Sequence, residues 1–233
     1  MIKYHKKIID SIFDRGGSHV IEGVRFEDCI FVNSAISLTE KIDRRSTVRN
    51  AKIIRCKSNG CHVGPVVLED VTIDGLLTND LLIIWGATFH HVTLKGDIGK
   101  LKINRWVDGV DRTEATQGPF DADRQALYQR IDWALDISQA RFKEFDVEGI
   151  PAKLIRRDPE SQVVVTRERA LQEGWREQLS PSNTLWPFVI DLFLSDGVDD
   201  VVLVAPLGAP KPKRDRLLQG LKELRDLGVA NPD

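Results

Sequence analysis

The histidine pair His90-His91 is the first group of residues in this sequence that could do chemistry. It could hold a metal ion, or His90 could act as a base oriented by Asp70. Adjacent residues on a strand point to opposite faces, so the two histidines do not easily share one ion. A five-residue repeat also places His91 in the interior, and no nucleophile falls near Asp70. We therefore predict no catalytic residue here.

Cys56, Cys61 and His62 form a second group that could bind zinc. The two cysteines are separated by four residues, which is wider than the two-residue spacing of common zinc sites. Both fall on interior positions of the repeat, where cysteine often serves as a small apolar filler. With Cys29 the chain has 3 cysteines, an odd number that favours a reducing, cytoplasmic compartment over a disulfide framework. We predict no metal and no cofactor.

A third group, residues 208–214, reads Gly-Ala-Pro-Lys-Pro-Lys-Arg between an expected strand and an expected helix. This context suits phosphate at a helix N-terminus. However, the phosphate-loop pattern is absent, and Pro210 and Pro212 remove two backbone donors. The stretch is therefore interpreted as a solvated loop. Asp80 and Asp97 fall on neighbouring parts of the repeat, which gives only a weak match to β-helical enzymes that cleave acidic polysaccharides.

The element that would position these groups is a repeat of five residues over 51–105. Stepping by five from Ala51 to Leu101, ten of eleven positions are apolar or small. Stepping from Ile53 to Ile103, seven of eleven are Ile, Val or Leu, and the rest are Ser or Thr. A pair of inward residues followed by a bend explains both series, and four such sides make a coil of about 20 residues. Repeats of this kind predict a solenoid, in which each unit buries its apolar side against its neighbours.

The units that match this form best are residues 24–28, 29–33 and 34–38, followed by residues 66–105 and 140–149. They resemble the pentapeptide-repeat family, whose fold is a right-handed four-sided β-helix. In that family the centre of each unit is usually Leu or Phe. This rule is broken at four positions, Ser58, Thr78, Thr88 and Thr93. A coil with three sides is therefore an alternative to the coil with four sides. Some members bind topoisomerases by imitating the acidic surface of DNA, but residues 24–105 carry a balance of +3, which argues against that role.

The coil length predicts which outward residues lie above one another and which sides face a partner. Asp70 should lie below His90, Asp80 below Lys100, Trp85 below Arg105, and Asn59 below Asn79. One polar side is a candidate partner surface, formed by Lys57, Asn59, Leu77, Asn79, Asp80, Asp97 and Lys100. Another side presents an apolar patch that either the second half of the chain covers or a dimer uses, formed by Leu82, Ile84, Trp85, Phe89 and Leu94.

The remaining chain divides into capping elements and a second unit. Residues 1–15 are expected to form a helix that caps the solenoid, and residues 121–136 an amphipathic helix that covers its apolar sides. We therefore expect a right-handed β-helix over 1–155 with an α/β cap over 156–233. The cap has expected strands at 162–165 and 198–205, with helices at 166–179, 180–194 and 213–227.

Composition limits the function without naming it. The net charge of −2 predicts no strong attraction to nucleic acid, and no apolar run approaches the roughly 18 residues of a membrane span. The first hypothesis is a non-enzymatic protein-binding module of a bacterial type, such as an inhibitor or immunity partner of an effector. A second is an enzyme at the junction of solenoid and cap, using His90, Asp70 or the 206–214 loop. A third is a structural protein that self-assembles through the apolar patch.

Overall fold

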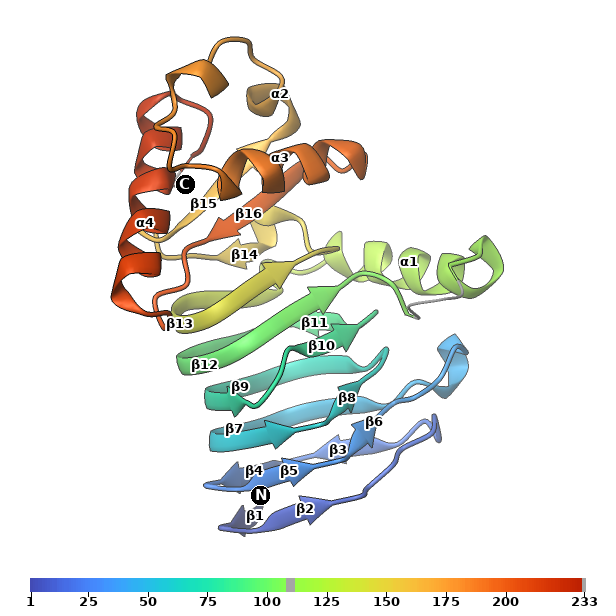
Figure 1. Cartoon of the computed structure of the whole chain (residues 1–233). Coiled ribbons are helices and arrows are strands. Elements are labelled where there is room, and N and C mark those ends of the chain that lie inside the picture. The colour runs from blue at the N-terminus through green and yellow to red at the C-terminus, as the bar shows by residue number, and fades with distance from the viewer. Residues whose placement is uncertain (108–111, 232–233) are drawn as a thin grey trace.

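The computed structural model describes residues 1–107 and 112–231, and a large curled parallel sheet dominates it. The strands lie above one another, with the N-terminus at the lower end in Figure 1. The strands of this sheet are β1 (Ile2–His5), β2 (Ile8–Asp10), β3 (Val20–Glu22), β4 (Val24–Glu27), β5 (Ile30–Val32), β6 (Ala35–Ile36), β7 (Thr47–Asn59), β8 (His62–Val63), β9 (Val67–Thr78), β10 (Leu82–Trp85), β11 (Thr88–His90), β12 (Val92–Asn104), β13 (Leu135–Val147) and β14 (Ile155–Arg156).

The strand pairings fall into four columns, because the long strands β7, β9 and β12 bend and each pairs with at least three other strands along its length. One column begins at Ile2, which pairs with Val24, and ends at Ile155, which pairs with Leu135. Paired residues are 22 apart in the first case and 20 in the second. The predicted spacing of about 20 residues is close to the observed register in these two steps and in the steps from β7 to β9 and from β9 to β12, whereas the spacing is 27 from β4 to β7 and 43 from β12 to β13.

Residues with left-handed backbone torsion angles mark the bends. Asp28, Arg55, Gly75 and Gly96 all have positive φ, between 49° and 78°, and lie one above another in successive turns of the sheet. This region of φ is unfavourable for most residues with a Cβ and favours Gly, Asn and Asp. A column of such residues turns the chain at the same place in each layer, which keeps the strands above one another.

The predicted exposure of the apolar patch is wrong, because most of its side chains lie in the apolar core that the curled sheet surrounds. Leu82, Ile84, Phe89 and Leu94 are buried in the main apolar core, and Trp85 is half-buried. Leu76 pairs with Ile98 and Leu82 with Leu101, so the bend between β9 and β10 holds three more residues than the bend above it. A strict count by five therefore predicts inward positions that are shifted by one residue after this bend. Because side chains alternate along a strand, a shift of one residue assigns the inward side chains to the outside.

The same shift displaces three of the four predicted stacks. His90 pairs with Glu69 instead of Asp70, and Trp85 pairs with Asn104 instead of Arg105. Lys100 lies over Thr78, whose Oγ1 accepts a hydrogen bond from the Lys100 N–H at 2.9 Å, and not over Asp80. Ser58 pairs with Thr78, and this register places Asn79 above Asn59 as predicted, because the extra residues come after this point.

The predicted N-terminal capping helix is also wrong. Residues 1–15 contain β1 and β2, which pair with β4 and β5. Ile2 and Tyr4 have the two-residue alternation of a strand, and they continue the inward positions of Val24 and Phe26. Partners supplied by the next layer of the sheet override the weak helical spacing of this segment.

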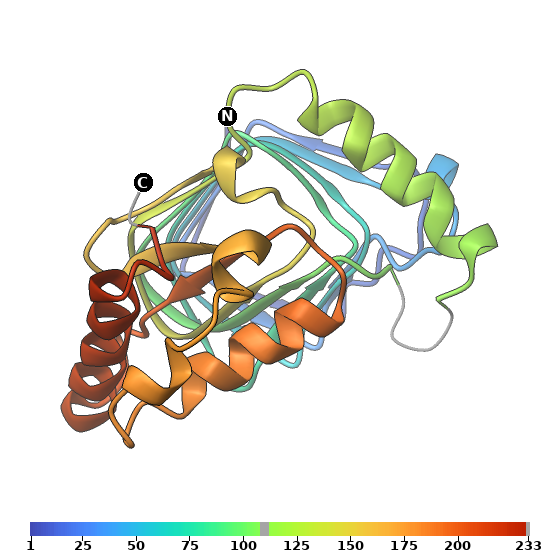
Figure 2. The ribbon, with the colours of Figure 1, turned by 90° about the horizontal axis from the view of Figure 1, so that it is seen from above.

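One helix, α1 (Glu114–Tyr128), is inserted between β12 and β13 and lies along the outside of the sheet (Figure 2). It begins before the predicted range of 121–136, because the Thr113 Oγ1 caps it by accepting from the Thr116 N–H. It ends earlier because residues 135–136 pair with β12. The buried Tyr128 holds it to the sheet, since its hydroxyl accepts from the Phe89 N–H at 3.3 Å. The polar sequence of residues 107–119, with Gly109, Gly118 and Pro119, predicts a loop. Residues 108–111 lie outside the described residues, and residues 114–119 belong to α1 instead.

The C-terminal cap is a small α/β unit with its own apolar core, which includes Val163, Ile190, Leu203 and Leu221. Its strands β15 (Gln162–Thr166) and β16 (Asp200–Val204) are antiparallel. Its helices are α2 (Arg167–Ala170), α3 (Leu185–Ser195) and α4 (Lys211–Asp226), and it contains a short 3₁₀ turn at Arg176–Gln178. Two further 3₁₀ turns, at Ile42–Arg44 and Ala152–Leu154, lie outside the cap. The expected mixture of strands and helices is present, although α2 and α3 are shorter than predicted. The cap sits above β13 and β14 (Figure 1).

Candidate functional site

The N-terminal end of the curled sheet has a free strand edge. Among the described residues, β1 pairs only with β4 and β2 only with β5. The N–H groups of Ile2 and Lys6 donate to Gly23 and Glu27 at 2.8 and 3.0 Å. Because successive residues of a parallel strand face opposite sides, the backbone groups of Lys3 and His5 point away from β4. Such an edge is a template for another strand.

Apolar side chains gather at this same end. Seven of the thirteen exposed large apolar residues in the described chain lie within residues 1–20: Met1, Ile2, Tyr4, Ile8, Ile12, Phe13 and Val20. Ile2 and Tyr4 occupy inward positions but are 60% and 38% exposed, because no layer lies beneath them. Tyr4 stacks on Phe26 at 4.9 Å between ring centroids. The end therefore exposes the last layer of the apolar core.

An ion network fixes β1 to the layer above it. The Glu27 carboxylate accepts from Arg55 at 2.8 Å and Arg25 at 3.1 Å, and Lys3 lies 3.2 Å away. The hydrogen bond from Arg55, followed by those from Lys3 and Arg25, lowers the pKa of Glu27 to about 2. Arg55 also reaches Asp28 at 2.8 Å. These contacts keep the edge strand in place and leave its lower side open.

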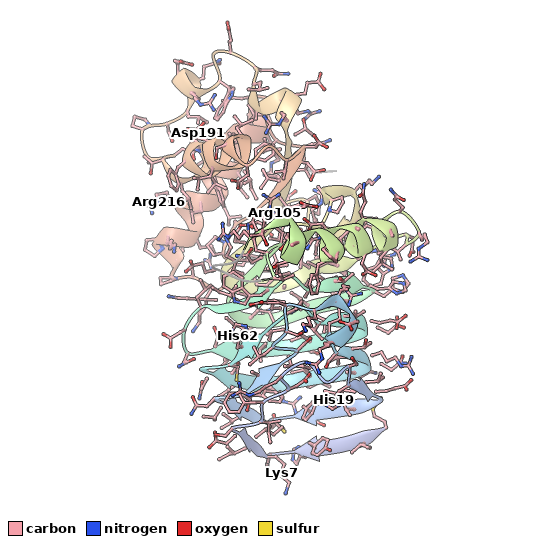
Figure 3. All side chains as sticks on the ribbon, turned by 90° about the vertical axis from the view of Figure 1, so that its right-hand side faces the viewer. Lys7, His19, His62, Arg105, Asp191 and Arg216 are labelled. Carbon is pink, nitrogen blue, oxygen red and sulfur yellow. The ribbon has the colours of Figure 1, made fainter. Side chains whose placement is uncertain are left out.

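Most charges at this end that lack a salt bridge among the described residues are positive, and the exception is Asp10, whose carboxylate accepts from the Ser11 hydroxyl at 2.9 Å. Lys6, Lys7 and Arg15 make no salt bridge with another described residue, and Lys7 lies at the bottom of the molecule in Figure 3. The nearby Asp14 is occupied within the fold, because its carboxylate accepts from the N–H groups of Gly16 and Ser37 at 3.0 Å and from the Ser46 hydroxyl at 2.5 Å. The end is thus apolar, basic and hydrogen-bonding at once.

The predicted polar partner surface does face outward. Lys57, Leu77, Asn79, Asp80, Asp97 and Lys100 are exposed, and Asn59 is half-buried. Register brings Lys57 beside Leu77. The layer above neutralises two of its charges, since Asp97 pairs with Arg141 at 2.9 Å and Lys100 with Glu144 at 4.0 Å. A partner at this surface stays a prediction. The surface has fewer unpaired charged and backbone groups than the N-terminal end.

The histidine pair lies at a bend and fastens the segment after α1. His91 has φ +53° and is half-buried, so its predicted place in the interior is wrong. Its Nε2 lies 2.8 Å from Asp132 and its Nδ1 3.5 Å from Asp70. His90 lies 3.3 Å from Glu69. In the part of the chain that the structure describes, no three His, Cys, Asp or Glu side chains are close enough to hold a metal ion.

A cleft of about 600 Å³ lies where the curled sheet meets the cap. Lys102 and Arg105 come from the sheet side, and Arg105 marks this level in Figure 3. The cap contributes residues 189–202 of α3, β16 and the loop between them. An enzyme site was predicted at this junction, but His90, Asp70 and the 206–214 loop do not line the cleft. Gly208 instead donates to the Phe142 carbonyl, which holds that loop against β13.

The cysteines are separate and occupied by backbone contacts. Cys29 and Cys56 are buried, Cys61 is half-buried, and all three are free. The Cys56 thiol donates to the Ile54 carbonyl at 3.4 Å, and burial raises the pKa of this thiol.

The acidic residues of the cleft were not predicted from the sequence. Residues 196–200 have only the pattern of a loop that leads into a strand.

Comparison with family models, with curated proteins and with solved structures finds no match for the chain. Within the described residues, the helices are too short or too polar to cross a membrane. The function of the chain is therefore inferred from the geometry and chemistry of its own surfaces.

Proposed function

We propose that this chain is a non-enzymatic protein-binding module whose docking surface is the open N-terminal end of the curled sheet. The observation that carries the proposal is the concentration of exposed apolar side chains on a free strand edge within residues 1–20. An extended segment that adds to this edge would pair the backbone groups of Lys3 and His5 and cover Ile2 and Tyr4. Pairing gives affinity, and the side chains give specificity.

The chemistry of the end favours an extended, acidic and apolar segment of another protein. Unpaired N–H and C=O groups at strand spacing are matched by a peptide backbone and not by the phosphates of a nucleic acid. Lys6, Lys7 and Arg15 would meet Asp or Glu side chains that flank the apolar contacts. In this proposal the present chain acts as an inhibitor or immunity-type partner, and the segment that it binds belongs to a bacterial effector.

A second copy of this chain fits the end less well. Contact between the N-terminal ends of two copies would bring together two sets of the cations Lys6, Lys7 and Arg15, which have no salt bridge among the described residues. Like charges brought close together oppose association. Homodimerisation is therefore an outcome of the test and not the proposal.

The test is selection of peptides from a random phage-displayed library, followed by calorimetry with three forms of the protein. His5→Pro removes a backbone N–H that faces the free edge, where proline is tolerated. His5→Ala is the matched control, since it removes the same side chain and keeps the N–H. We expect the enriched peptides to alternate apolar residues with Asp or Glu. We also expect His5→Pro to weaken their binding at least tenfold and His5→Ala less than threefold.

The outcomes separate the alternatives. Enriched peptides that bind His5→Pro as tightly as the parent would overturn the proposed edge, as would binding that maps to the Lys57 side. Failure to enrich any peptide would contradict the module itself. A concentration-dependent dimer by light scattering that His5→Pro abolishes would assign the edge to a second copy.

We infer further that the four columns are the sides of a right-handed β-helix of the pentapeptide-repeat kind. A spacing of 20 to 22 residues between paired positions supports this in four of the six steps of the column from Ile2 to Ile155, and the two longer steps, 27 residues from β4 to β7 and 43 from β12 to β13, hold inserted segments. The stacked left-handed residues at the bends support it too. An experimental structure in which the columns do not enclose a common interior would contradict it.

A further inference from the structure

The cleft at the junction of sheet and cap has the size and lining of a small-molecule site. Its volume of about 600 Å³ lies within the roughly 300–1,000 Å³ typical of ligand pockets. Apolar side chains from both sides form its floor: Val147, Ile150, Pro151, Val189, Phe193 and Val202. Leu192, which is half exposed, extends this apolar surface toward solvent. An organic body would be desolvated on such a floor.

The two walls of the cleft differ in charge. On the sheet side, the Lys102 ammonium lies 2.7 Å from both Asp146 and Glu148, so most of its charge is already matched. On the cap side, Asp196, Asp199 and Asp200 make no salt bridge with another described residue. Arg105 also lines the sheet side, and it makes no salt bridge with another described residue. The lining still holds five carboxylates, Asp146, Glu148, Asp196, Asp199 and Asp200, against the two cations Lys102 and Arg105, so the cleft carries an excess of negative charge.

Two further features add to the negative field of the cap wall. Helix α3 ends at Ser195, so the negative end of its dipole points toward Asp196 and the cleft. Asp200 is partly buried, and its Oδ1 accepts from the Ala152 N–H at 3.1 Å. Burial raises the pKa of Asp200 and the charge of Asp199 adds to this, while the hydrogen bond from Ala152 and the charges of Arg157 and Lys153 oppose it only in part.

We propose that this cleft binds a small organic cation, namely a protonated amine or amidine carried on an apolar body. The apolar floor takes the body, and the carboxylates of Asp196 and Asp199 take the charge. A bare metal ion fits less well, because no three carboxylates in the described residues come close enough to coordinate one. An anion would meet an excess of carboxylates.

The test compares benzylamine with benzyl alcohol, two probes that share a ring and differ in charge at pH 7. Calorimetry gives affinities, and amide chemical shifts at Gly149 and Gly197 locate the binding. Asp196→Asn/Asp199→Asn removes two exposed charges from the cap wall. Asp215→Asn/Asp226→Asn is the matched control, since it removes two charges from α4, where they pair with Lys211 and Lys222 outside the cleft.

We expect benzylamine to bind at least tenfold more tightly than benzyl alcohol, and to shift Gly149 and Gly197. The cleft double variant should weaken benzylamine at least fivefold, leave benzyl alcohol unchanged, and be unlike the α4 control. Equal affinity for the two probes, shifts confined to other residues, or no saturable binding of benzylamine would each overturn the proposal. None of these outcomes depends on the N-terminal edge.

Discussion

The two ends of the curled sheet are built from the same kinds of residue and finished in opposite ways. At the N-terminal end, Ile2 occupies an inward position and is 60% exposed, while Ile155 at the other end of the same column is 4% exposed. The difference comes from the α/β cap, which packs over β13 and β14, whereas no described residues form such a layer below β1. A repeat needs an end structure to bury its last layer, and the described residues supply one at the end near β14 and none below β1.

The same contrast extends to electrostatics. At the open end Glu27 is surrounded by Lys3, Arg25 and Arg55, and the charges without a salt bridge among the described residues are Lys6, Lys7 and Arg15 against the one carboxylate of Asp10, so the unpaired charge there is mainly positive. The carboxylates at the capped end include Asp196, Asp199 and Asp200, which lack salt-bridge partners in the described chain. An exposed layer with cations suits a strand from another protein, whereas a cleft with unpaired carboxylates suits a small cation.

The largest effect should come from the same substitution at the two ends of one column. Ile155→Ala removes a fully packed side chain and should lower the free energy of unfolding by about 2–5 kcal/mol. Ile2→Ala removes a side chain that is already in water, and it should cost below about 1 kcal/mol. Urea unfolding followed by circular dichroism measures both. Equal losses would show that Ile2 is covered in solution and would remove the contrast between the ends.

How far the sequence predicts this molecule depends on the same contrast. The five-residue spacing predicted stacked parallel strands because interior positions such as Val71 and Ile73 must be apolar in every layer. It could not predict the extra residues in the bend before Leu82, because bends face water and tolerate insertions. That single change of phase moved Phe89 and Leu94 from an expected surface to the core, and moved His91 to a bend.

The functional residues were harder to predict for a physical reason. The free edge of β1 is visible only once its neighbours are known, and residues 1–15 have enough apolar residues in helical spacing to suggest a cap. The cleft joins Lys102 to Asp199, far apart in the sequence, and neither belongs to a motif. By contrast, the strand at 162–165 and the Thr166 cap were predictable, since both depend on local residues.

The second prediction concerns the turn that anchors the open end. Burial opposes ionisation of Asp14, but hydrogen bonds from Ser46, Ser37, Gly17 and Gly16 outweigh it and lower its pKa. Asp14→Asn should therefore cost about 1–3 kcal/mol at pH 7. A lowered folded pKa gives stability that is present above 3.8 and lost as the pH falls through the folded value, so the variant and parent should converge in acid.

Hydrogen exchange can show where the Asp14→Asn effect is felt. Peptides from β1 and β2 should exchange faster in the variant, while peptides from β15 and β16 should not change. Uniformly faster exchange over the whole chain would mean that the two ends unfold as one unit. Asp10→Asn is the control, since the Asp10 carboxylate accepts only from the neighbouring Ser11 hydroxyl among the described residues.

The third prediction tests whether the layers between the two ends form one cooperative unit. Tyr128→Phe removes the hydroxyl that accepts from the Phe89 N–H and leaves a buried donor unpaired, at a cost of about 1 kcal/mol. Because β11 pairs with β9 alone among the described residues, exchange should rise together in peptides from β11 and β9. A rise confined to α1 would instead show that the helix opens independently of the sheet.

The smallest effect is expected at Asp200, and it has the opposite sign to that at Asp14. Burial raises the folded pKa of Asp200, so ionising this carboxyl opposes folding. That cost is absent below the unfolded value of 3.8 and fully present once the pH exceeds the raised folded value. Asp200→Asn keeps an oxygen that can accept from the Ala152 N–H and should make the protein slightly more stable at pH 7. Thermal unfolding between pH 7 and pH 3.5 measures this gain, which should shrink as the pH falls. A loss of stability at pH 7 would mean that a cation already pairs with the Asp200 carboxylate. The carboxylates at both ends of the sheet would then be paired with cations.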